Sequence, residues 1–180
     1  MIRKAKESDI DGILNVLSHY DLKVVRPVDG SPIDADYQDL LTLYNQVSEI
    51  DLRNAFVAVQ DGKIVGFCHY KHQGENAAKT TLLTVLPEFR GFGLGEKLQL
   101  ARMREAREKG YKILLTFCET PATVDWYVKH FGYKILETEP VYHRLHFFQL
   151  KNRTIWAVHY GSKEQKFLQV LVCNLEDFFK

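Results

Sequence analysis

A glycine-rich turn is the part of the sequence that points most directly to chemistry. Glycine occupies every second position in Arg90-Gly91-Phe92-Gly93-Leu94-Gly95, directly after an apolar run and directly before a helical pattern. Alternate glycines let the main chain curl with several N–H groups pointing inward. The turn also opens a helix, whose unpaired first-turn N–H groups and positive dipole end favour anions. These features predict a phosphate or pyrophosphate site, to which Arg90 adds a permanent positive charge.

Two better-known phosphate loops do not fit these residues. The dinucleotide fingerprint needs Gly-x-Gly-x-x-Gly, whereas the third glycine of this turn comes one residue too early. The nucleoside-triphosphate loop needs Lys-Ser or Lys-Thr after its last glycine, but Gly95 is followed by Glu96 and Lys97. A glycine-rich turn that binds no ligand is the other interpretation of this stretch.

The elements around the turn follow from the apolar pattern. Residues 79–86 are predicted to form a buried strand, because they end in a short apolar run that Pro87 terminates. A helix is predicted over 94–109, with a buried stripe that starts at Leu94, Leu98 and Ala101 and weakens at Glu105. A second apolar strand follows at 113–118. A strand, helix and strand in this order require parallel pairing and a right-handed crossover.

The rest of the chain also alternates between strands and helices. Asp61-Gly62 between two apolar runs is the clearest hairpin signal. The predicted strands are 2–6, 56–60, 63–71, 133–137, 141–150 and 154–160, and the predicted helices start at Ser8, at Ser31-Pro32 (extending to Val47) and at Thr120-Pro121. Beyond these, residues 168–179 fit the buried stripe of a last helix, while residues 167–172 would also serve as a strand.

Two motifs together make this sequence similar to the GCN5-related N-acetyltransferases, the GNAT superfamily. The first is Arg-x-x-Gly-x-Gly at 90–95, after a strand that ends in Val-x-Pro. The second is Trp126-Tyr-Val-Lys-His-Phe-Gly-Tyr133, which resembles the family's Tyr-x-x-x-Gly-Phe. Four residues instead of three separate Tyr127 from Gly132, and Tyr133 replaces the phenylalanine. The resemblance covers residues 1–150.

The resemblance implies an α/β (α+β) GNAT fold. Its centre would be a mixed, mostly antiparallel sheet of about seven strands with flanking helices. Strand 79–86, helix 94–109 and strand 113–118 would form its parallel unit. Residues 1–150 would form the acetyltransferase domain, and residues 151–180 a C-terminal extension of a strand and a helix, packed on the domain or at an interface.

Acetyl-CoA is the co-substrate that the resemblance implies, and no metal is expected. The turn would bind the pyrophosphate, and the thioester carbonyl would lie near the main-chain N–H of Val85, where a bulge frees that donor. Thr120 stands where the family often has an asparagine. The expected cofactor-binding residues are Leu83, Thr84, Val85, Arg90, Gly91, Phe92, Gly93, Leu94, Gly95, Thr120 and Tyr127.

Acyl transfer to an amine also needs acid and base groups. The resemblance places Tyr127 beside the sulfur as general acid, whereas periodicity alone favours an ordinary tyrosine on a buried helix face. Candidates for the base are Glu119, after the strand 113–118, and His69, in the hairpin, although both residues also fit purely structural roles. Cys118 keeps a covalent route open, but a buried structural cysteine is favoured because no cationic residue adjoins it in the sequence.

The predicted function is therefore direct transfer of an acetyl group to a primary amine of a small molecule or peptide. Residues 29–51 hold six acidic residues and no Lys or Arg. This segment would attract a cationic acceptor, or it is simply a solvated helix face. The alternative function is a non-catalytic acetyl-CoA-binding module that acts as a sensor or assembly domain.

Composition limits the class of protein. The chain has 180 residues, a formal net charge of +1 and 46% hydrophobic residues, which is ordinary for one globular domain. Such a balance gives no reason to expect a nucleic-acid partner, and no apolar run is long enough to span a membrane. Three widely spaced cysteines suggest reduced thiols in a cytoplasmic protein. The sequence leaves a homodimer open.

Overall fold

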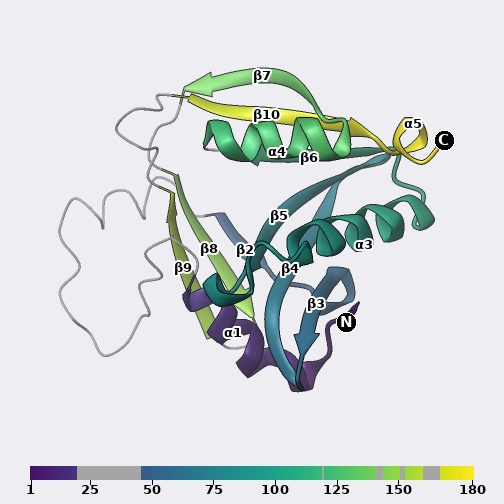
Figure 1. Ribbon diagram of the computed structural model, residues 1–180. Coiled ribbons are helices and arrows are strands. Elements are labelled where there is room, and N and C mark those ends of the chain that lie inside the picture. Colours follow the sequence, from purple (N-terminus) through teal and green to yellow (C-terminus); the bar gives the residue numbers. More distant parts are fainter. Residues whose placement is uncertain (20–45, 119, 141–143, 151–152, 160–166) are drawn as a thin grey trace, which may run out of the picture.

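The computed structural model describes residues 1–19, 46–118, 120–140, 144–150, 153–159 and 167–180 (Figure 1). The strands are β1 Ile2–Lys4, β2 Gln46–Glu49, β3 Ala55–Gln60, β4 Lys63–Gly74, β5 Ala77–Val85, β6 Ile113–Cys118, β7 Lys134–Pro140, β8 Arg144–Leu150, β9 Arg153–His159 and β10 Phe167–Asn174. The α-helices are α1 Ile10–Ser18, α3 Leu94–Glu108, α4 Pro121–Phe131 and α5 Leu175–Phe178. One-turn 3₁₀ helices cover Glu7–Asp9, Leu52–Asn54 and Pro87–Phe89.

The central sheet has seven strands in the order β1-β3-β4-β5-β6-β10-β7. All neighbours are antiparallel except β5 and β6, which run parallel on either side of the crossover through α3. The mixed, mostly antiparallel sheet with one parallel unit is therefore confirmed. Its membership differs from the expectation, because β8 pairs with β2 and β9 in a separate three-stranded sheet.

The seventh strand of the central sheet comes from the end of the chain. β10 lies between β6 and β7 and pairs with both. The strand interpretation of 167–172 is confirmed, and a helix over 168–179 is wrong except for the short α5. The reason is that Val170, Leu171 and Cys173 are all buried, as expected of a strand covered on both faces. Residues after Leu150 thus complete the sheet.

The predicted second helix differs at its end. Most of it lies outside the described residues, but the stretch around Val47 forms β2, which pairs in parallel with β8. Pairing with a neighbouring strand has overridden the helical spacing of the apolar residues, as tertiary contacts often do with a weak local preference.

The predicted hairpin and helix caps are present. Asp61 and Gly62 have φ values of 50° and 76°, so both central residues of the β3–β4 turn are left-handed, as the tightest hairpin turns require. Thr120 caps α4 by accepting a hydrogen bond from Thr123 N (3.2 Å), and Gly132 ends the helix with φ 62°.

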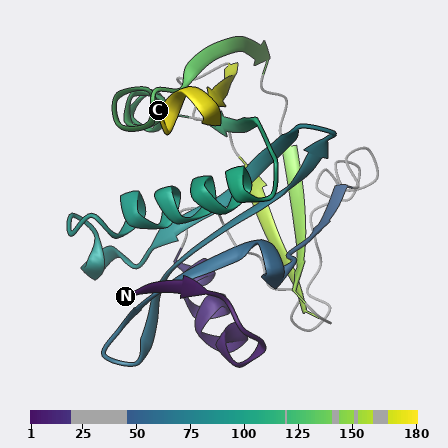
Figure 2. The same cartoon turned by 90° about the vertical axis from the view of Figure 1, so that its right-hand side faces the viewer.

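Helices cover both faces of the sheet. Figure 2 shows α1 and α3 on opposite sides of β3 and β4. The backbone of α1 approaches the sheet closely at Gly12, where an added Cβ would lie 2.6 Å from the Ile64 side chain. The buried face of α3 contains two polar residues that the predicted stripe omitted: it consists of Leu98, Gln99, Arg102, Met103 and Ala106.

Glu105, at which the predicted stripe of α3 weakens, ties three elements together. Its carboxylate accepts hydrogen bonds from Lys4 of β1 (2.6 Å), the hydroxyl of Tyr70 in β4 (2.6 Å) and Lys109 at the end of α3 (2.9 Å). Burial acts to raise the pKa of this carboxyl, but the three donors outweigh it, so the pKa lies below its usual range. Glu105 therefore stays charged and anchors α3 to the sheet.

Replacing this carboxylate should destabilise the fold. We expect Glu105→Ala to lower the free energy of unfolding by about 1–3 kcal/mol, because the hydroxyl of the buried Tyr70 loses its acceptor. Urea unfolding followed by circular dichroism measures the change. The exposed Glu108→Ala is the matched control and should stay within about 0.5 kcal/mol of the parent chain. Equal stability of both variants would contradict the anchoring role of Glu105.

Candidate active site

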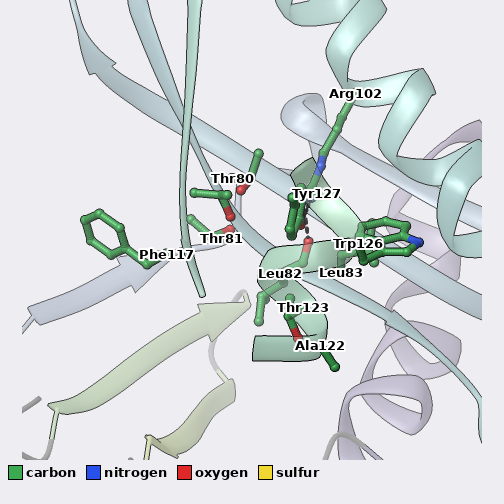
Figure 3. Close-up of a pocket in the computed structure, with 11 residues that line it drawn as sticks. Thr80, Thr81, Leu82, Leu83, Arg102, Phe117, Ala122, Thr123, Trp126 and Tyr127 are labelled. Carbon is green, nitrogen blue, oxygen red and sulfur yellow. Dashed lines mark hydrogen bonds between the residues drawn. The ribbon is translucent and has the colours of Figure 1, made fainter. Parts of the chain in front are cut away.

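The candidate site lies where β5 and β6 part. These strands pair only over Ala77–Lys79 and Ile113–Leu115, although both continue for several more residues. Beyond this point β6 and α4 splay away from β5 (Figure 1). A cavity of 440 Å³ fills the gap, and residues of β5, α3, β6 and α4 line it (Figure 3): Thr80, Thr81, Leu82, Leu83, Arg102, Thr116, Phe117, Ala122, Thr123, Trp126 and Tyr127.

The main chain of β5 presents hydrogen-bonding groups to this gap. Leu86 N donates to Val65 O on β4, and the direction of such bonds alternates along an antiparallel strand. The N–H groups of Leu83 and Val85 therefore point away from β4, toward the side that β6 has left. The predicted bulge at Val85 is wrong: pairing is regular from Leu82 to Val85, and the extra residue is Thr81.

The glycine turn adjoins the cavity. Gly91 and Gly93 have φ values of 82° and 72°, and an added Cβ at either would meet no atom within 4 Å. Glycine is therefore needed for the left-handed backbone, and the space over the turn is open. An added Cβ at Gly95 would touch Leu83 and Trp126, both in the cavity wall. The turn and the cavity thus form one continuous surface.

Arg90 is oriented by the strand that precedes it. Its Nε donates to the main-chain oxygen of Val85 at 2.9 Å, and its side chain is otherwise exposed. Within the described residues, its two terminal nitrogens have no hydrogen-bond partner. They remain available for an anion at the mouth of the turn.

Tyr127 projects from α4 into the core of the site. It is 5% exposed, and its hydroxyl oxygen accepts a hydrogen bond from Arg102 Nη2 at 2.8 Å. Burial raises the pKa of Tyr127, and Arg102 and a hydrogen bond from Thr116 offset part of that rise. Because Arg102 donates to its oxygen, the phenol keeps its own proton available as a donor.

Arg102 lines the cavity although the sequence analysis did not include it among the site residues. It lies four residues after Leu98 and four before Ala106, so it belongs to the buried face of α3. That spacing is the signal that could have found it, but an arginine in an amphipathic helix usually lies on the solvated side. Here it is 1% exposed and reaches the wall of the cavity (Figure 3).

Comparison with known proteins places this geometry in a family. Residues 51–135, which include the glycine turn and Tyr127, match the family described as the acetyltransferase (GNAT) domain. Residues 51–135 of the chain form a GNAT acetyltransferase domain. Three features of the chain represent the GNAT fold: the order of the strands in the sheet, the parallel pair β5–β6 that splays apart, and the glycine turn at the start of α3.

Two curated relatives are amino-acid acetyltransferases. The protein from Shewanella oneidensis is 28% identical over 130 residues, which are 72% of this chain and 26% of the relative. The protein from Ralstonia nicotianae is 32% identical over 130 residues, covering 66% of this chain and 28% of the relative. The chain thus spans about a quarter of the length of the curated relatives it matches.

Solved GNAT structures match nearly the whole chain. A putative acetyltransferase from Salmonella typhimurium, solved with its cofactor acetyl-CoA, has a TM-score of 0.63 and 18% identity and covers 97% of this chain and 93% of its own. N-acetylglutamate synthase from Neisseria gonorrhoeae, complexed with coenzyme A and N-acetyl-glutamate, has a TM-score of 0.59 and 17% identity. It covers 97% of this chain and 35% of its own.

The candidate site brings together only part of the predicted residue set. Leu83 and Tyr127 line the cavity, and residues 90–95 form the turn beside it. Phe92 is 72% exposed at the tip of that turn. The hydroxyl of Thr120 is occupied in capping α4, and Thr84 is buried within β5. Glu119, a predicted base, lies outside the described residues, as does most of the acidic segment 29–51.

In the part of the chain that is described, no helix has the length and apolar character needed to cross a membrane.

His69, the other predicted base, is buried behind the cavity wall. It is 1% exposed, and its Nδ1 lies 2.6 Å from the hydroxyl of Thr81, the bulged residue of β5. Its Nε2 has no hydrogen-bond partner among the described residues. Burial lowers the pKa of His69 to about 3, with Asp51 opposing the change and Arg102 adding to it. The ring is therefore neutral at physiological pH.

The neutral His69 should make stability fall at mildly acidic pH. An unfolded histidine binds a proton below about pH 6.5, whereas the folded ring does so only near pH 3, so stability is lost as pH falls through this window. From pH 7 to pH 5 the loss from this group should be about 2 kcal/mol. Urea unfolding at both pH values measures it.

Two variants isolate this contribution. His69→Asn keeps an amide group near the Thr81 hydroxyl but cannot titrate, so its loss of stability between pH 7 and pH 5 should be smaller by that amount. The exposed His72→Gln on the same strand should keep the full loss. If His69→Asn and the parent chain lose the same stability, the ring is not held neutral.

Proposed function

We propose that this GNAT protein is an acetyl-CoA-dependent N-acetyltransferase that transfers an acetyl group directly to a primary amine. The observation that carries the proposal is one continuous surface: a glycine turn at a helix N-terminus, outward N–H groups on β5 and the phenol of Tyr127 border the same 440 Å³ cavity. Each feature matches one part of a thioester coenzyme, namely a diphosphate, an amide-containing arm and a reactive sulfur.

The residues present fit coenzyme A in chemical terms. The first-turn N–H groups of α3 and the free terminal nitrogens of Arg90 suit the diphosphate. The main-chain groups of Leu83 and Val85 can pair with the amides of the pantetheine arm as an additional strand would. Structural neighbours bound to acetyl-CoA or coenzyme A support this assignment.

The side chains divide the work of acyl transfer between them. The amine must attack as a neutral group, the carbonyl oxygen must be stabilised as it gains charge, and the departing thiolate needs a proton. Tyr127 would donate that proton, because it lines the cavity and Arg102 donates a hydrogen bond to its oxygen. The outward N–H groups of β5 are the candidates for stabilising the carbonyl oxygen.

Both predicted bases stay predictions. A ring with a pKa of about 3 takes a proton from an ammonium group poorly at neutral pH. For His69 we therefore propose a hydrogen-bonding role through its unpartnered Nε2. The amine would then lose its proton to water or to Glu119.

The similar proteins suggest which chemical class of amine the acceptor belongs to. Two of them are amino-acid acetyltransferases, and a structural neighbour holds N-acetyl-glutamate. We propose an amino acid or a small peptidyl amine as the acceptor class. The acidic residues of segment 29–51 still suggest a net cationic acceptor, such as a basic amino acid.

Release of free thiol from acetyl-CoA in the presence of an amine tests this function. A panel of amino acids, small amines and peptides should contain acceptors that raise thiol release above the rate without acceptor. Tyr127→Phe should lower kcat by about a hundredfold or more, because the thiolate then leaves without a positioned acid. Tyr111→Phe, on a partly exposed tyrosine that does not line the cavity, is the control and should retain activity.

Two outcomes would count against the proposal. If no acceptor raises thiol release although acetyl-CoA binds, the protein is a non-catalytic acetyl-CoA-binding module. If acceptors are found but Tyr127→Phe is as active as the parent chain, the transfer is real and Tyr127 is not its acid.

A further inference from the structure

Arg102 is a buried cation with no carboxylate partner among the residues that the structure describes. Within the described residues, its guanidinium donates to His69 O (3.2 Å), Leu82 O (2.8 Å), Gln99 Oε1 (2.6 Å) and the hydroxyl of Tyr127 (2.8 Å). All four acceptors are neutral. A buried charge is costly unless a counter-ion accompanies it, so the site is electrostatically incomplete.

A second layer of side chains fixes the position of this guanidinium. Gln99 accepts from Arg102 Nε and donates through Nε2 to the hydroxyl of Tyr133 (3.1 Å). The Tyr133 ring in turn packs edge-on against Tyr127, with centroids 5.0 Å apart. Gln99, Arg102 and Tyr133 are all at least 98% buried. The chain has thus built a polar network in its core whose end point is the oxygen of Tyr127.

We propose that Arg102 is a positioning residue that serves as the counter-ion of Tyr127 during acetyl transfer. The inference rests on the proposed function and deepens it. Arg102 holds the phenol with its proton directed into the cavity and stabilises the phenolate that forms when the proton leaves. A fixed cation suits this task, because it binds the phenolate more tightly than the neutral phenol and so favours the transition state.

The proton and electron balance of the step is complete. The amine nitrogen forms a bond to the acetyl carbon, and the carbon–sulfur bond breaks with its electron pair on sulfur. The proton of Tyr127 moves to sulfur, which leaves as a thiol. The proton lost by the attacking amine passes to solvent, and solvent restores the proton of Tyr127. Arg102 keeps all its protons throughout, as a guanidinium does.

The surroundings of Tyr127 contain no other fixed positive charge that the structure describes. The titratable groups that face it are Arg102 of α3, Cys118 of β6 and Tyr133, which precedes β7. Burial raises the pKa of Tyr127, Cys118 adds to the rise, and Arg102 and Thr116 oppose it. On the far side of Arg102 lie Cys68 and His69 of β4, both uncharged at neutral pH.

A purely structural role is the competing explanation. Arg102 also donates hydrogen bonds to the carbonyls of His69 on β4 and Leu82 on β5. These two residues pair directly beside the bulged Thr81. If Arg102 only links these two strands, its loss would weaken folding and coenzyme binding. The size of that effect would not depend on the phenol of Tyr127. The two roles therefore separate in a double-mutant cycle.

The experiment compares the parent chain, Arg102→Met, Tyr127→Phe and the double variant in the thiol-release assay. We expect Arg102→Met to lower kcat by about a hundredfold. In the Tyr127→Phe background the same change should alter kcat by no more than about twofold, because its target is already gone. Multiplying losses would overturn the proposal. Arg104→Met, on the exposed face of the same helix, is the matched control and should keep full activity.

The pH profile gives a readout that a structural role would not move. Because the charge of Arg102 lowers the pKa of Tyr127, its removal should shift the alkaline limb of kcat to higher pH. Arg102→Lys, which keeps a charge, should shift it less. An alkaline limb that stays in place in Arg102→Met would also overturn the proposal.

Chemical rescue covers the case in which Arg102→Met folds poorly. In Arg102→Ala, millimolar guanidinium should restore part of kcat, whereas urea, its neutral counterpart of the same shape, should not. If guanidinium and urea restore kcat equally, or if neither restores it, the charge of Arg102 does not have the proposed role. Melting curves and coenzyme A affinities of all variants show which losses of activity result from unfolding or from weaker coenzyme binding.

The outcome also separates this inference from the proposed function. If the parent chain transfers acetyl groups and Tyr127→Phe does not, the function holds whatever Arg102 does. If the parent chain transfers no acetyl group to any acceptor, both ideas fail together, and the titration of the chain with coenzyme A then shows whether it is a binding module.

Discussion

The early end of the pairing between β5 and β6 is the constraint on which the site depends. A parallel pair that continued past Lys79 would close the cavity and use the main-chain groups of β5 on β6. The sheet remains intact because β10 enters from the end of the chain and pairs with β6 along its whole length. The split thus exposes backbone donors at the centre of the molecule without leaving β6 as an edge.

A second consequence of the split is a polar core between two helices. Gln99 and Arg102 of α3, Tyr127 of α4 and Tyr133 after α4 form a connected hydrogen-bond network. Such a network costs stability unless its members are satisfied. Helix α3 is also anchored by Glu105, whose three donors come from different parts of the chain. Glu105 follows Arg102 by three residues, so the anchor and the polar network lie within one turn of α3.

Local signals in the sequence predicted the local structure well. The Asp61-Gly62 turn, the glycine turn before α3 and the capped helix ended by Gly132 each depend on a few adjacent residues with restricted backbone geometry. The features that were missed depend on distant pairing. The spacing around Val47 fits a helix, but pairing with β8 makes this stretch a strand. The position of β10 in the sheet depends on its pairing with β6 and β7. Arg102 was missed because its burial follows from contacts with distant residues, namely the carbonyls of β4 and β5 and the hydroxyl of Tyr127.

The central claim is that the turn at 90–95 and the gap beside β5 form a single coenzyme site, and calorimetric titration with coenzyme A tests it most directly. The parent chain should bind one equivalent. Gly93→Ala, which forces a side chain onto a left-handed backbone, should bind about tenfold more weakly, a difference of roughly 1.4 kcal/mol. Gly74→Ala, at an open position without that strain, should bind like the parent. No heat from the parent chain, or equal affinity of all three proteins, would contradict the account.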